Sequence, residues 1–130
     1  MIRRIASCSC GHLRITCEAE PERVSICHCL ECQKRTGSVF AAQARFAAEA
    51  VTIEGEARRW TRVGESGEPA TFSFCPTCGA TVCWERAGAI LVATGAFADP
   101  SFPAPQIAVY EERQHPWVRA IGELPMERHV

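Results

Sequence analysis

The chain has 130 residues, of which 47% are apolar, so it can bury a core without disulfide or metal staples. We expect one domain over residues 1–130. Its 14 basic and 15 acidic residues give a net charge of −1, with basic residues clustered at most in pairs. A nucleic-acid-binding surface usually shows a basic stripe and a high isoelectric point, so this class is disfavoured. No apolar run approaches the roughly 18 residues of a membrane span, and no apolar leader segment opens the chain, which predicts a soluble, cytoplasmic protein.

Alternation of apolar and polar residues, the pattern of a half-buried strand, recurs along the chain. We expect strands over residues 12–18, 24–26, 40–46, 51–53, 59–61, 72–75, 82–84, 89–94, 107–112 and 117–121. Residues 64–69 form a loop, and residues 98–105, with three prolines, cannot be regular. Residues 45–51 allow one helical turn, but no stretch of 12 residues has helical periodicity. The pattern predicts a mainly β fold of short antiparallel strands with little helix.

Seven of the nine cysteines fall in three tight clusters: Cys8 and Cys10; Cys27, Cys29 and Cys32; Cys75 and Cys78. The last pair resembles a zinc knuckle, because Pro76 favours a tight turn and Gly79 permits left-handed backbone. A knuckle supplies two ligands, whereas a structural zinc takes four. Cys8 and Cys10 point the same way on an extended chain, which makes them the natural second pair.

The central cluster offers three thiolates within six residues and no fourth cysteine. Three protein ligands with one open position is the pattern of catalytic zinc, whose fourth ligand could be water, a substrate thiol or another side chain. His28 lies between Cys27 and Cys29, so on an extended segment it points away from the metal. We expect His28 to support the ligands or contact substrate instead.

Four alternatives to zinc stay open for these cysteines. A disulfide within C-x-C is strained, and a redox C-x-x-C expects a thioredoxin-like βαβ context. Plain core cysteines do not usually cluster in this way, and an iron–sulfur cluster could use the same thiolates. We favour zinc, with two ions per chain, because thiols in a reducing compartment are more often metal ligands than disulfides. Cys17 and Cys83 lie outside the clusters, and we expect them in the core together with Trp84 and Trp117.

Two pairs of alternatives concern the residues that follow the central cluster. Lys34 and Arg35 either offset the charge of three thiolates and bind a substrate carboxylate, or lie in solvent as ordinary charges. Thr36, Gly37 and Ser38 either form a turn that presents donors to the metal, or form a simple structural turn. All five are candidate contacts of a thiol substrate.

Five segments resemble the glutathione-dependent formaldehyde-activating enzyme family, which includes relatives of centromere protein V. They are CSCGHLRITC (8–17), CHCLECQKRTGSVF (27–40), IEGEARRW (53–60), FCPTCGATVCW (74–84) and YEERQHPWV (110–118). The resemblance implies a zinc-dependent, tent-like β fold. It implies a structural zinc on Cys8, Cys10, Cys75 and Cys78, and a second zinc on Cys27, Cys29 and Cys32. It also implies glutathione as the partner and its condensation with formaldehyde, a carbon–sulfur lyase-type activity, as the reaction.

Two functions therefore compete. In an enzyme, the open zinc would hold a thiol as its nucleophilic thiolate while an aldehyde approaches. In a non-catalytic scaffold, a fourth side chain would close the second zinc and the surface would bind a protein or nucleic acid. The missing fourth cysteine favours the enzyme, and the near-neutral charge weakens the nucleic-acid version of the scaffold.

Overall fold

A computed structural model describes residues 2–120, 125 and 127, and it confirms the mainly β prediction with ten strands in two sheets. The smaller sheet is antiparallel, with the order β1 (Arg4–Ser7), β2 (Arg14–Cys17) and β5 (Val51–Glu54). The larger sheet has the order β10 (Ile107–Val109), β3 (Arg23–Cys27), β4 (Ala41–Ala47), β9 (Ala89–Ala93), β8 (Thr81–Arg86), β7 (Pro69–Phe74) and β6 (Arg58–Val63). Only the β10–β3 pair is parallel among the described strands.

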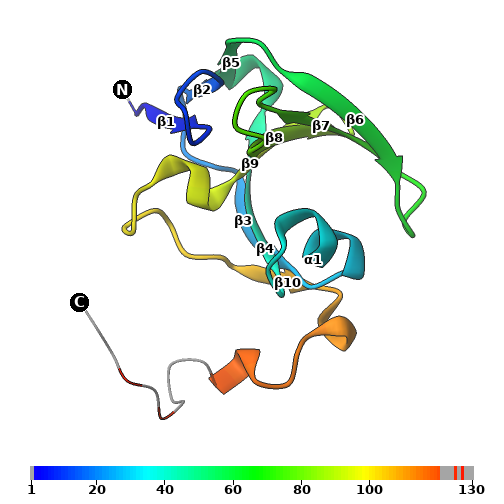
Figure 1. Ribbon diagram of the computed structural model, residues 1–130. Helices are drawn as coiled ribbons and strands as arrows, with labels where there is room; N and C mark the ends of the chain where they lie inside the picture. Colours follow the sequence, from blue (N-terminus) through cyan, green and yellow to red (C-terminus); the bar gives the residue numbers. More distant parts are fainter. Residues whose placement is uncertain (1, 121–124, 126, 128–130) are drawn as a thin grey trace.

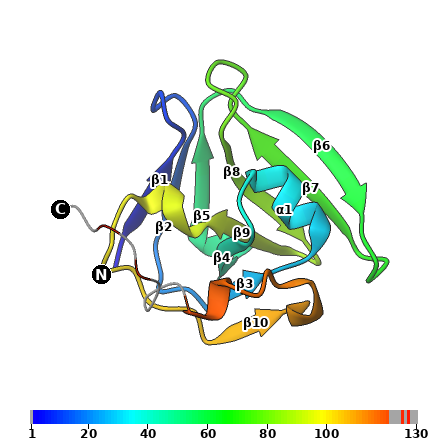
Figure 2. The same cartoon turned by 60° about the horizontal axis from the view of Figure 1, so that its bottom comes forward.

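The larger sheet is strongly curved, and the helix α1 (Leu30–Thr36) lies on its concave side (Figures 1 and 2). The β6–β7 hairpin extends from one end of the sheet, and β10 with β3 forms the other end. The smaller sheet stands beside the opposite side of the larger one. This arrangement leaves the concave side, with α1 above it, as the place where a site can form.

The main core contains the inward faces of both sheets. Its largest fully buried side chains are Phe46, Leu13, Ile15, Val24, Val82 and Val92. Cys17 and Cys83 are buried in the same core, as expected. A second apolar cluster of Ala70, Phe72, Trp84 and Leu91 covers the concave face of β7, β8 and β9.

Helix α1 was not apparent from periodicity because it has only seven residues. Its ends are nevertheless well defined by local chemistry. Cys29 caps the helix, since its sulfur accepts a hydrogen bond from the Cys32 N–H at 3.3 Å. Gly37 ends it with φ of 71°, and its N–H donates to the Gln33 carbonyl at 2.9 Å.

Two predicted strands near the carboxyl end need correction. The strand expected over 107–112 ends at Val109, because Tyr110 has φ of 56° and Glu111–Arg113 form a 3₁₀ turn. The strand expected over 117–121 is wrong: Val118–Ala120 is a 3₁₀ turn that follows Pro116, and residue 121 lies outside the described residues. The helical turn expected over 45–51 is limited to Ala48–Ala50, because residues before it pair with β9.

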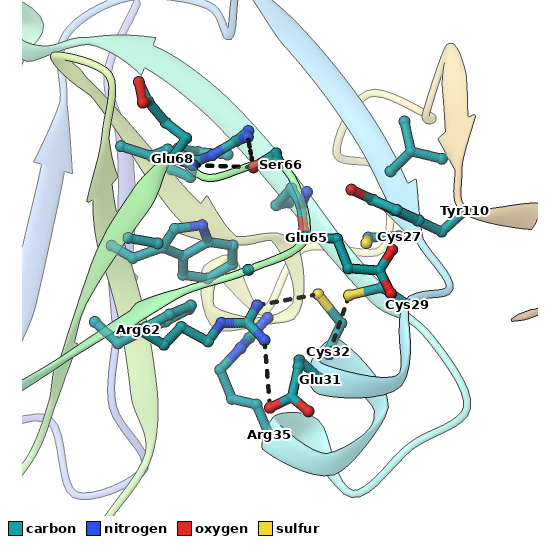
Figure 3. A pocket seen from close by; sticks show the side chains of 18 of the residues that line it. Cys27, Cys29, Glu31, Cys32, Arg35, Arg62, Glu65, Ser66, Glu68 and Tyr110 are labelled. Atoms are coloured by element: carbon teal, nitrogen blue, oxygen red, sulfur yellow. Dashed lines mark hydrogen bonds and ion pairs between the residues drawn. The ribbon is translucent and has the colours of Figure 1, made fainter.

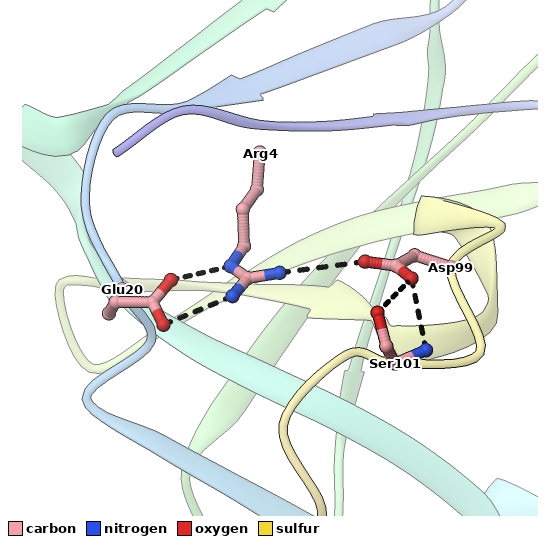
Figure 4. Close-up of polar contacts among 4 residues, drawn as sticks. All are labelled: Arg4, Glu20, Asp99 and Ser101. Carbon is pink, nitrogen blue, oxygen red and sulfur yellow. Dashed lines mark hydrogen bonds and ion pairs between the residues drawn. The ribbon is translucent and has the colours of Figure 1, made fainter. Parts of the chain in front are cut away.

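An ion-pair network fastens β1 to two loops (Figure 4). The Arg4 guanidinium bonds both carboxylate oxygens of Glu20, at 2.5 and 3.0 Å, and lies 3.7 Å from Asp99. Asp99 also accepts hydrogen bonds from the backbone and hydroxyl of Ser101. The guanidinium is stacked 4.8 Å above the Phe102 ring. The Arg4 bond to Glu20 lowers the pKa of that carboxyl, as expected for a direct ion pair.

No helix in the described part of the chain is both long and apolar enough to cross a membrane.

Candidate metal centres and the adjoining pocket

The structure brings together the four cysteines at the ends of β1 and β7, which we call the four-cysteine cluster: Cys8, Cys10, Cys75 and Cys78. All four sulfurs lie within 4.8 Å of one another, although Cys10 and Cys75 are 65 positions apart. Each pair sits on a tight turn that ends in a glycine with positive φ, 82° at Gly11 and 78° at Gly79. An L side chain at either position would be strained.

The backbone around the four-cysteine cluster favours thiolates. The Leu13 N–H donates to the Cys8 sulfur at 3.2 Å, and the Thr77 N–H donates to the Cys75 sulfur at 3.4 Å. The backbone N–H of Ala80 lowers the pKa of Cys78 to about 6. Four converging sulfurs with such donors fit a tetrahedral zinc site, because zinc prefers thiolate ligands in this number and geometry.

The second group, Cys27, Cys29 and Cys32, is the three-cysteine cluster. Cys27 ends β3, Cys29 caps α1 and Cys32 lies in the first turn of that helix, so a strand end and a helix start bring them together. Their sulfurs also lie within 4.8 Å of one another. Cys27 and Cys32 are buried, whereas Cys29 is partly exposed. His28 is not in this group: its ring is buried 6.0 Å from the Phe40 ring.

A pocket of about 570 Å³ adjoins the three-cysteine cluster, between α1 and the concave face of the larger sheet (Figure 3). Its floor is the second apolar cluster, in which Phe72 and Trp84 are paired across β7 and β8. Trp84 therefore lines the pocket as well as being buried, which corrects the expectation that it is only a core residue. Trp117, also expected in the core, is 44% exposed.

The remaining walls of the pocket carry charges of both signs, from four arginines and three glutamates. They are Arg23, Arg35, Arg62, Arg86, Glu31, Glu65 and Glu68. Such a pocket suits a ligand that carries positive and negative groups for the charged walls and an apolar part for the floor.

Two of these arginines lie beside the three-cysteine cluster. Arg35 stacks on Trp84 at 4.3 Å and on Phe72 at 5.1 Å, and Arg62 lies 5.1 Å from the same Phe72 ring. The Arg62 Nη2 atom is 3.8 Å from the Cys32 sulfur, and Nη1 is 3.8 Å from a Glu31 carboxylate oxygen. Both guanidiniums therefore place positive charge where thiolates would concentrate negative charge.

Two thiols of this cluster, those of Cys27 and Cys32, change each other's pKa. Hydrogen bonding with Cys27 lowers the pKa of Cys32 to about 5, and Arg35 and Arg62 act in the same direction. The bond with Cys32, together with burial, raises the pKa of Cys27. A bound metal would ionise all three thiols.

The structure separates the five predicted substrate contacts. Arg35 lines the pocket, whereas Lys34, Thr36, Gly37 and Ser38 are absent from the described residues that line it. Lys34 is 73% exposed and pairs with Glu31 at 2.7 Å. The Thr36 hydroxyl donates to the Cys32 carbonyl at 2.9 Å, so it completes the end of the helix. The simple structural turn is therefore the better description of residues 36–38.

Sequence reasoning missed Arg62 and Tyr110. The signal for Arg62 is the β6–β7 register, which pairs Trp60 with Phe72 and Arg62 with Ala70, so both β6 side chains share the concave face. That register depends on the length of the 64–68 loop, which the alternation pattern did not specify. For Tyr110, alternation predicted that the strand would continue through it, and its only signal was its place at the start of the family-like segment 110–118.

A family model described as glutathione-dependent formaldehyde-activating enzyme matches residues 3–113 of this chain. A search of curated proteins found no significant match. Among solved structures, a Rhodobacter sphaeroides protein from a structural genomics programme is similar, with a TM-score of 0.54 and 22% identity. The match covers 71% of this chain and 85% of that one. At this identity the likeness concerns the fold alone.

Proposed function

The chain belongs to the family of glutathione-dependent formaldehyde-activating enzymes, and on that premise we propose that it joins a small thiol of the glutathione type to formaldehyde or a similar aldehyde. The observation that carries the proposal is the three-cysteine cluster at one end of the 570 Å³ pocket, beside Arg35 and Arg62. Three thiols leave one position of a tetrahedral metal for a ligand.

We further propose that both cysteine clusters hold zinc. The four-cysteine cluster would hold a structural ion, and Cys27, Cys29 and Cys32 would hold the second. When bound there, zinc would supply a position at which a substrate thiol ionises to its nucleophilic thiolate. The donor sets of both clusters fit this metal.

The residues of the chain then have distinct roles. Arg62 and Arg35 offset the negative charge that several thiolates accumulate, so that a further thiolate can approach. Phe72 and Trp84 present an apolar wall and displace water from the reacting atoms. Arg23 and Arg86, which also line the pocket, are suited to the carboxylates of a glutathione-like thiol.

The reaction is an addition that needs no oxidant or reductant. The thiol loses its proton, its sulfur forms a bond with the aldehyde carbon, and the electron pair of the broken C=O π bond moves to oxygen. Protonation of that oxygen gives the hydroxymethyl thioether, so the product contains all atoms of both reactants. The pocket would accelerate this step by holding the thiol sulfur and the aldehyde carbon close together in the geometry that the reaction needs.

The test is the rate of S-hydroxymethylglutathione formation compared with the same mixture lacking protein, because thiols also add to formaldehyde without a catalyst. We expect wild-type protein to exceed the control and Cys29→Ser to fall to it, since Cys29 is the most exposed member of the cluster. Elemental analysis should show two zinc ions per chain in wild type and one in the variant. A wild-type rate equal to the control, with both ions bound, would instead favour the non-catalytic scaffold.

A further inference from the structure

Tyr110 is the single tyrosine of the chain, and its backbone is in the left-handed region, with φ of 56° and ψ of 40°. This conformation is uncommon for a residue other than glycine, asparagine or aspartate, and least expected for a bulky side chain. Such residues persist only where surrounding contacts impose the conformation, and they concentrate at functional sites.

The contacts that impose it come from the three-cysteine cluster itself. Val109 pairs with Cys27 in the parallel β10–β3 ladder, and its carbonyl accepts the His28 N–H at 3.0 Å. On the other side of Tyr110, the Gln33 side chain of α1 donates to the carbonyls of Arg113 and His28. The chain is thus fixed on both sides of Tyr110 by the segment that carries the cysteines.

The turn directs the Tyr110 ring toward those cysteines. The ring packs against the buried group of Cys27, Cys32 and Ala41, and it forms part of the pocket wall. In Figure 3 the phenol reaches from the β10 side into the pocket, and Arg62 with Glu31 approaches the cysteines from another side. The described residues provide no hydrogen-bond partner for the Tyr110 hydroxyl, so its O–H is available to a ligand.

The other hydrogen-bond donors near the three-cysteine cluster either have partners already or are buried. Arg62 is directed at Cys32 and Glu31. The Nε and Nη2 atoms of Arg35 are buried where its guanidinium stacks on Trp84, without a hydrogen-bond partner among the described residues. Ser25 also lines the pocket, two residues before Cys27. Its aliphatic hydroxyl is, however, a much weaker acid than a phenol.

We propose that Tyr110 is a catalytic residue whose phenolic O–H protonates the aldehyde oxygen while the thiol sulfur adds to the carbon. The inference rests on the proposed function, because it assigns the donor for that addition. As the S–C bond forms, the electron pair of the C=O π bond moves to oxygen, and this oxygen takes the phenol proton. Water returns a proton to the phenolate, which balances the proton that the thiol released.

The first test is Tyr110→Phe, which keeps the ring and its packing and removes only the hydroxyl. We expect kcat to fall by about 10²-fold, the usual effect of removing one donor from a developing oxyanion. The KM for the thiol, the zinc content and the melting temperature should stay at wild-type values. Ser25→Ala is the matched control at another hydroxyl that lines the pocket, and a loss in Ser25→Ala without one in Tyr110→Phe would overturn the assignment. The assignment would also be overturned if the loss of activity in Tyr110→Phe came only from a lower zinc content or only from a higher KM.

A second test does not depend on turnover. With 3-fluorotyrosine incorporated, the single tyrosine gives one fluorine resonance in NMR. We expect S-(2-hydroxyethyl)glutathione, which carries a hydroxyl beside the sulfur, to shift it more than S-ethylglutathione does. Equal shifts, measured with both compounds at saturating concentration, would overturn the role of the hydroxyl. If wild type shows no rate above the protein-free control, the proposed reaction fails, and the resonance still decides whether Tyr110 contacts such a ligand.

Discussion

The two cysteine clusters use the same ligand chemistry in opposite surroundings. The four-cysteine cluster joins turns that are far apart in the sequence, ends in two left-handed glycines and supplies a complete tetrahedral set. The three-cysteine cluster comes from six consecutive residues, leaves the set incomplete and faces a charged pocket. From ligand number and sequence separation we therefore expect the four-cysteine cluster to hold the fold together and the three-cysteine cluster to be available to a substrate.

The largest effect should follow from breaking the four-cysteine cluster. Cys75 is fully buried, and Cys75→Ser removes a ligand that connects the two halves of the site. Structural zinc contributes about 10 kcal/mol or more to folding, which is comparable to the roughly 5–15 kcal/mol of total stability. We expect the variant to be unfolded, or to melt far below wild type in a circular dichroism experiment.

The matched control is Cys29→Ser, which should lose one zinc ion and melt close to wild type. Its cluster spans one strand end and one helix start, so it closes no long loop. Similar losses of melting temperature in both variants would refute the division into a structural and a functional cluster.

A smaller effect should appear in the pH dependence of thiol binding. A free thiol of this type has a pKa near 8.5, and coordination through sulfur releases its proton, so affinity should rise by up to about tenfold per pH unit below that value. Calorimetry with glutathione would measure it, and S-methylglutathione, which has no thiol proton, is the control. Affinity that is equal for the two compounds, or independent of pH, would exclude coordination through sulfur.

The smallest effect should distinguish two neighbouring cations on α1. Arg35 lines the pocket and stacks on Trp84, whereas Lys34 is 73% exposed and pairs with Glu31. We expect Arg35→Met to weaken glutathione binding by roughly 0.5–2 kcal/mol, and Lys34→Met to leave it unchanged. Calorimetry of both variants measures the difference. Equal weakening would mean that the whole charge of α1 acts at long range, instead of Arg35 acting by contact.

The fold class and the assembly of both clusters followed from simple rules. Alternation over residues 12–18 placed Ile15 and Cys17 on a buried face, which the structure confirms. The convergence of the C-x-C and C-x-x-C pairs was argued from ligand number, and the structure brings these four sulfurs together. These features could be predicted because each depends on a few adjacent residues.

The pocket could not be predicted, because it depends on contacts between distant segments. Trp84 is both buried and pocket-lining because β8 is an interior strand of a curved sheet. Tyr110 departs from the strand pattern because α1 and β3 fix the chain on both sides of it. Helix α1 was not predicted because a seven-residue helix depends on its caps, Cys29 and Gly37, more than on periodicity.

The 65 positions between Cys10 and Cys75 have a consequence for the order of folding. During synthesis, the segment that carries Cys27, Cys29 and Cys32 is complete long before Cys75 and Cys78 emerge, so the local cluster is available to capture a metal first. The amino-terminal pair, Cys8 and Cys10, can complete its ligand set only after the β7–β8 turn with Cys75 and Cys78 has been made. The cluster expected to do chemistry is thus ready early, whereas the one expected to hold the fold is assembled late, by closing a loop of high entropic cost.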